Sequence, residues 1–84
     1  YVDVFSPEIH NLYGTALAAL GRNEDAAYEA ESALLCEPPP KEAAKAHALL
    51  ARVRLAQGNG AEARRHRDEA LKLDEASEAR SLAV

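Results

Sequence analysis

Residues 10–38, HNLYGTALAALGRNEDAAYEAESALLCEP, decide the fold, because most of their pattern returns 37 residues further along the chain. Each copy begins with an apolar segment at helical spacing, continues through a turn rich in glycine and asparagine, and ends with regularly spaced alanines. The pairs that match at this offset include His10 and His47, Gly21 and Gly58, Ala26 and Ala63, and Ala33 and Ala70. The repeat predicts two similar helix–turn–helix units.

The composition is typical of a small folded helical unit. The chain has 84 residues, of which 48% are hydrophobic, 29% charged and only 5% aromatic. Alanine supplies much of the hydrophobic share, and it has the highest helix propensity. The single cysteine excludes an internal disulfide. Because the chain starts at Tyr1 and contains no methionine, we interpret it as a piece of a longer protein.

The charge and the hydropathy pattern limit the kind of partner. A net charge of -4 argues against a general nucleic-acid binder, which usually carries a basic surface. No run of about 18 apolar residues is present, so the sequence predicts no membrane-spanning segment. We therefore expect neither nucleic acid nor a membrane as the partner.

The first unit has clear boundaries. Residues 1–6 form an extended lead-in, and Ser6-Pro7-Glu8 is a strong helix start. The apolar face expected for this helix consists of Ile9, Leu12, Tyr13, Ala16, Leu17 and Leu20. Gly21 ends the helix, Asn23 caps the next one, and Pro38-Pro39-Pro40 stops that second helix.

The second unit contains a helix from about Lys41 to Gln57 and another from about Ala61 to Asp74, separated by Gly58-Asn59-Gly60. The apolar face of the first of these helices consists of Ala46, Leu49, Leu50, Val53 and Ala56. Ser77 then looks like the cap of a fifth, truncated helix. Because Glu75 replaces proline, helix 61–74 running on through Glu75 is the alternative; we favour the break.

The two units resemble tetratricopeptide repeats, whose pattern places aromatics, a Leu-Gly pair, alanines and a proline at set spacings. The resemblance is carried by His10, Tyr13, Gly14, Leu17, Gly21, Ala26, Ala30, Ala33 and Pro38. Some positions depart from the pattern: His10 and His47 stand in place of the first aromatic, and Arg54 and Arg67 replace apolar residues. The offset is three residues longer than the family's period of about 34 residues.

The resemblance implies an all-α fold in which antiparallel helix-turn-helix hairpins stack as a right-handed α-solenoid. The first repeat would span residues 7–40 and the second residues 41–77, with residues 78–84 as the start of a capping helix. An unrelated pair of helical hairpins is the alternative.

The resemblance also implies a binding groove, because the first helix of each repeat lines the concave side in this family. The groove candidates are Glu8, Asn11, Leu12, Thr15, Lys45, Leu49, Arg52 and Leu55. Lys41, Lys45, Ala48 and Arg52 form one helical stripe, so we expect a preference for acidic, extended peptides. An ordinary solvated helix face is the alternative.

Some members of the family grip the terminal carboxylate of a peptide with lysine and asparagine side chains. The matching positions here are Asn11, Thr15 and Leu49. Two of these three lack a suitable side chain, so that kind of peptide binding is not expected.

The sequence predicts no catalytic, cofactor-binding or metal-binding residues. His10 and His47 are expected to pack between helices, no His-Glu-x-x-His pair exists, and Cys36 has no second cysteine for a zinc site. No set of nucleophile, base and orienting residue can be assembled.

We therefore expect a non-catalytic protein–protein interaction scaffold that binds a peptide or a partner helix. The alternatives are a structural spacer or oligomerisation segment, and an accessory domain of a larger enzyme. The apolar residues at the two ends are expected to support self-association; these are Val2, Val4, Phe5, Leu82 and Val84.

Overall fold

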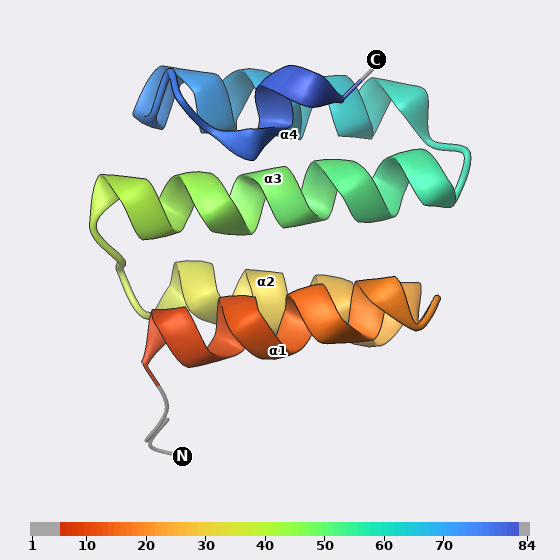
Figure 1. Cartoon of the computed structure of the whole chain (residues 1–84), viewed down its shortest axis with the longest axis horizontal. Coiled ribbons are helices and arrows are strands. Elements are labelled where there is room, and N and C mark those ends of the chain that lie inside the picture. Colours follow the sequence, from red (N-terminus) through yellow and green to blue (C-terminus); the bar gives the residue numbers. More distant parts are fainter. Residues whose placement is uncertain (1–5, 83–84) are drawn as a thin grey trace.

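The computed structural model describes residues 6–82, and it is all-helical (Figure 1). The helices are α1 (Pro7–Ala19), α2 (Asn23–Leu35), α3 (Pro40–Ala56) and α4 (Gly60–Leu73), followed by the 3-10 helix η1 (Glu78–Ser81). No strand occurs within residues 6–82. The predictions for Val2, Val4, Phe5 and Val84 lie outside the described residues.

α3 is the central element of the fold. It lies between the α1–α2 hairpin and α4, and it contacts every other helix as well as η1 (Figure 1). Within the described residues, α4 contacts only α3 and η1. The two hairpins are therefore joined through α3 alone.

The two turns inside the hairpins have the same backbone geometry. Gly21 and Gly58 take φ values of 79° and 80°, a left-handed conformation that glycine adopts without strain. The next amide donates to a carbonyl five residues back, over 2.9 Å from Arg22 to Leu17 and 2.8 Å from Asn59 to Arg54. The 37-residue repeat therefore recurs in the backbone and not only in the sequence.

The helix starts agree with the sequence except at α2. The Ser6 hydroxyl accepts from the Ile9 amide at the start of α1, as predicted. Asn23 is the first residue of α2 and not its cap, so that prediction was wrong. The matching cap in the second hairpin is Asn59, whose side chain accepts from the Glu62 amide over 3.2 Å. The cap position falls one residue earlier than expected, and in the first hairpin Arg22 occupies it.

The core is built from small residues that let the helices approach closely. Ala26, Ala30 and Ala33 are fully buried on α2, where they meet Leu17 of α1. The α3 side of this core consists of Ala46, Leu49, Leu50 and Val53. Burial of these aliphatic side chains supplies the main driving force for folding.

The predicted apolar face of α1 is mostly not buried. Leu17 is in the core, but the rest of that face, namely Ile9, Leu12, Tyr13, Ala16 and Leu20, is exposed. The buried side of α1 consists instead of His10, Asn11, Gly14 and Leu17. Gly14 lets α1 approach α2 and α3 closely, which turns the larger side chains outward. On α3, Ala56 is also exposed, contrary to the prediction.

The C-terminal part of the described chain covers α4. α4 ends at Leu73, which confirms the predicted break, and the Ser77 hydroxyl accepts from the Ala79 amide. The expected fifth helix is only a 3-10 turn of 4 residues. Ala79 and Leu82 pack against Ala44 and Ala70, so Leu82 is half-buried and is not the exposed end residue that was predicted.

Candidate functional site: a groove between α1 and α3

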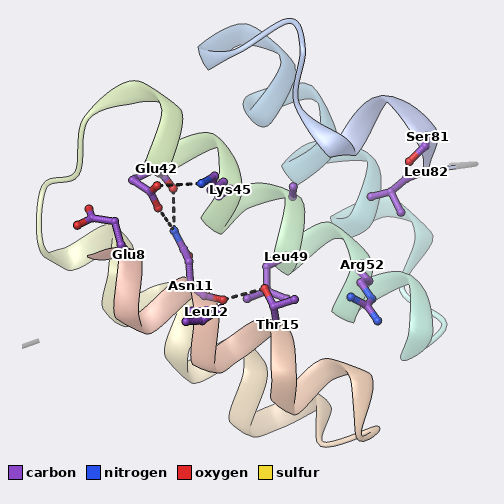
Figure 2. Close-up of a pocket in the computed structure, with 11 residues that line it drawn as sticks. Glu8, Asn11, Leu12, Thr15, Glu42, Lys45, Leu49, Arg52, Ser81 and Leu82 are labelled. Atoms are coloured by element: carbon purple, nitrogen blue, oxygen red, sulfur yellow. Dashed lines mark hydrogen bonds and ion pairs between the residues drawn. The ribbon is translucent and has the colours of Figure 1, made fainter. Parts of the chain in front are cut away.

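A groove with a volume of about 520 Å³ runs between α1 and α3 (Figure 2). Its lining contains seven of the eight residues predicted from the sequence: Glu8, Asn11, Leu12, Thr15, Lys45, Leu49 and Arg52. The structure adds Glu42, Ser81 and Leu82, and it includes Ala48 but not Lys41 of the predicted stripe. The expected groove residues of the two first helices thus come together on one surface.

Leu55 is the predicted residue that the groove does not include. It lies on the last turn of α3 and is exposed, whereas α3 contributes to the groove only as far as Arg52. Ser81 and Leu82 were missed because η1 folds back beside α3, and no local sequence pattern indicates that return. Glu42 was not among the predicted residues, although its spacing of three residues from Lys45 favours an ion pair on one helix.

Asn11 joins the two walls of the groove. Its side chain is 6% exposed, and its amide nitrogen donates to both the backbone oxygen and the side-chain Oε2 of Glu42, each over 3.0 Å. The amide oxygen Oδ1 of Asn11 is buried and has no hydrogen-bond partner. A buried acceptor without a donor costs about 1–3 kcal/mol. Because this oxygen has almost no exposed surface, it is a cost of joining the two walls and not a contact point for a ligand.

Glu42 is held as a carboxylate by its neighbours. Burial raises its pKa, but the hydrogen bonds from Asn11 and Lys45 together lower it further, so the pKa lies below its usual value of 4.5. The Lys45 ammonium lies 3.1 Å from Oε1 of Glu42. Part of the predicted basic stripe is thereby neutralised within the groove.

Arg52 is the remaining cation of the groove. It is exposed, and among the described residues it makes no ion pair or hydrogen bond. Lys45 and Arg52 are separated by about two helical turns, or about 10 Å along the axis. Figure 2 shows the Glu42–Lys45 pair and Arg52 at different ends of the groove. The two ends of the groove therefore differ in charge: Glu8 and Glu42 lie near one end and Arg52 near the other.

The histidines form a second repeated feature, inside the hairpins. Nδ1 of His10 lies 2.8 Å from Oε1 of Glu29, and Nδ1 of His47 lies 3.0 Å from Nδ1 of His66. Both pairs join residues 19 apart, and they are related by the same offset of 37. His10 and His47 thus occupy equivalent places between the helices of each hairpin, as predicted.

Burial determines the protonation of the second pair. It lowers the pKa of both His47 and His66 below the ordinary value of 6.5. The positive charge of Arg65 lowers both further, whereas Glu69 opposes the shift at His47 and Glu62 opposes it at His66. Neutral rings suit the contact, since one Nδ1 must donate and the other accept. Within residues 6–82 no group of three His, Cys, Asp or Glu residues is placed to hold a metal ion.

Comparisons with protein-family models, with curated proteins and with solved structures found no match for this chain. None of the helices in the described part has the length and apolar character needed to cross a membrane.

Proposed function

We propose that this chain is a non-catalytic protein-interaction module that binds an extended peptide in the groove between α1 and α3. The observation that carries the proposal is the groove itself, which α1 and α3 line together and in which Arg52 is a cation without a partner among the described residues. An extended peptide can lie along such a groove and present side chains to it at regular intervals.

The charges of the groove favour one kind of peptide. Arg52 has no partner among the described residues, so an acidic side chain of the ligand would pair with it. Lys45 already pairs with Glu42, so the preference centres on one acidic residue and not two. Exposed ion pairs contribute only ~0.2–1 kcal/mol, and apolar contacts with Leu12 and Leu49 would supply much of the affinity.

We further propose that the two hairpins are tetratricopeptide repeats. The shared turn geometry at Gly21 and Gly58 and the repeated histidine positions support this family, since both recur at the same offset. A structural spacer, whose groove binds nothing specific, is the second candidate. The Glu42–Lys45 ion pair favours it, because a groove that neutralises its own charge offers less to a ligand.

A peptide-library selection tests the proposal. The selection compares wild type with Arg52→Glu and with the double variant Lys45→Glu/Arg52→Glu, at low and moderate salt. Arg64→Glu is the matched control, because Arg64 is also exposed and without a partner among the described residues but lies on α4, outside the groove.

The expected result is that wild type and Arg64→Glu select the same peptides with an acidic residue at one position. Arg52→Glu should lose that acidic preference and most of the salt dependence. Identical selections by all the variants would show that the charges of the groove take no part in selecting a peptide, and the spacer would then be the better description.

A further inference from the structure

A second hollow, of about 1220 Å³, is formed by α1, α2 and the residue that follows α2. Its main apolar residues, which we call the open face, are Ile9, Leu12, Tyr13, Ala16, Tyr28 and Leu35. All six are exposed; Tyr13 is 57% exposed and Leu35 is 85% exposed. Clustered exposed side chains of this size are typical of surfaces that bind another protein.

The repeat indicates what kind of structure covers the open face. At the offset of 37 residues, four of its positions correspond to buried positions of α3. Ile9 corresponds to Ala46, Leu12 to Leu49, Tyr13 to Leu50 and Ala16 to Val53. These four residues of α3 form part of the core in which α3 packs against α1 and α2. The open face thus includes the surface of α1 that matches the core-facing surface of α3, but no helix among the described residues packs on it.

The observed interface also defines the chemistry of the partner. α3 is received by a helical hairpin whose second helix presents Ala26, Ala30 and Ala33 at spacings of four and three residues. Ile9 and Tyr13 are larger than Ala46 and Leu50, so a helix that approaches α1 must present residues at least as small.

The other end of this chain does not offer such a surface. On α4, Arg67 occupies the position that corresponds to Ala30. Ala70, which corresponds to Ala33, is already covered by Ala79 and Leu82. A second copy therefore cannot dock its α4 end on the open face in the way that α1–α2 receive α3.

We propose that the open face docks a helical hairpin whose second helix presents small residues at the spacing of Ala26, Ala30 and Ala33. The docked hairpin takes the position relative to α1 that the α1–α2 hairpin takes relative to α3. Association is directional, because η1 covers the α4 end, whereas nothing among residues 6–82 covers the open face.

The test supplies such a hairpin from the chain's own sequence. A second copy of residues 7–39 is fused before Ser6, in place of residues 1–5, through a short Gly-Ser linker. The reference is the chain of residues 6–84, and the measurements are circular dichroism and thermal unfolding. The added residues should be helical, and the Tm should rise by about 4–8 °C or more.

Two matched variants locate the effect. Tyr13→Glu in the receiving copy should remove the rise in Tm, although in the reference chain this exposed residue should tolerate the change with little shift in Tm. Leu20→Glu should leave the rise in Tm intact, because Leu20 is also an exposed apolar residue but does not line the hollow.

Three results would overturn the proposal. The first is an extended chain whose added residues are not helical or whose Tm does not rise. A rise in Tm that Tyr13→Glu does not remove counts equally against the proposal. The second is a concentration-dependent dimer of the 84-residue chain, seen by sedimentation and abolished by Tyr13→Glu, which would assign the face to a second copy. The third is a fall in Tm on deletion of residues 1–5 that Tyr13→Glu reproduces, which would assign the face to the chain's own N-terminal segment.

Discussion

Helix α1 approaches α2 and α3 closely at Gly14, and replacing Gly14 with alanine tests this approach directly. A methyl group added there would lie 2.6 Å from Cδ2 of Leu49, 3.1 Å from Cβ of Glu29 and 3.3 Å from the Ala26 carbonyl oxygen. Carbon atoms in favourable contact are about 3.5–4.0 Å apart, so the shortfall is roughly 1 Å against Leu49. The Leu49 methyl group can rotate, but Cβ of Glu29 is fixed to the α2 backbone.

The magnitude follows from two opposing terms. Overpacking of this kind costs about 1–3 kcal/mol. Alanine in the interior of a helix is favoured over glycine by about 1 kcal/mol, which offsets part of that cost. We therefore expect Gly14→Ala to destabilise the protein by about 0–2 kcal/mol.

Gly60→Ala is the matched control. Gly60 is the first residue of α4, it is exposed, and no atom lies within 4 Å of the position of an added methyl group. This variant should be neutral or more stable than wild type by up to about 1 kcal/mol. By these ranges the free energies of unfolding of the two variants differ by about 0–3 kcal/mol, with Gly14→Ala the less stable.

Urea unfolding, followed by circular dichroism, measures this difference from the urea concentration at the midpoint. This holds when the slope of the unfolding free energy against urea concentration is the same in both variants. A double variant with Leu49→Ala should reduce the cost of Gly14→Ala, because the nearest atom is then removed. If Gly14→Ala were more stable than Gly60→Ala, or if Leu49→Ala did not change the effect of Gly14→Ala, the close packing of α1 against α2 and α3 would be refuted.

Three further predictions follow from the core, the histidines and the groove. Ala26→Leu should cost about 1–3 kcal/mol in urea unfolding, whereas Leu in place of the exposed Glu31 should cost little; equal effects would contradict the hairpin. Because burial lowers the pKa of His47 and His66, stability should fall as the pH decreases from about 6.5 towards their folded-state values, and His66→Phe should flatten that slope. Glu42 has a lowered pKa, so its contribution should be lost only as the pH falls below its ordinary 4.5, and Glu42→Gln should remove that loss in acid unfolding.

The helices could be predicted well because their boundaries depend on local chemistry. Ser6 and Pro7 start α1, the two glycines with positive φ end α1 and α3, and the proline run separates α2 from α3. Each of these signals acts within a few residues of the chain. Most residues of the groove could be predicted for a related reason. Because α1 and α3 hold equivalent positions in the repeat, their facing side chains could be named in advance.

The buried face of α1 could not be predicted in the same way. Hydrophobic spacing indicated Ile9, Leu12 and Tyr13, but the structure buries His10 and Asn11 instead. Polar residues at a helix interface are favourable only when specific partners on other helices satisfy them, and those partners lie far away in the sequence. Glu29 is 19 residues from His10, and Glu42 is 31 residues from Asn11.

The two hairpins also show how one position of the repeat can acquire chemically different partners. His10 faces the Glu29 carboxylate over 2.8 Å, whereas His47 faces His66, and protonation of both His47 and His66 would place two cations 3.0 Å apart at their Nδ1 atoms. The second contact would then lose both its hydrogen bond and its neutrality. Acid should therefore loosen the α3–α4 hairpin, in agreement with the lowered pKa of both histidines. The residue that decides this difference is the partner on the second helix, which is Glu29 in one copy and His66 in the other.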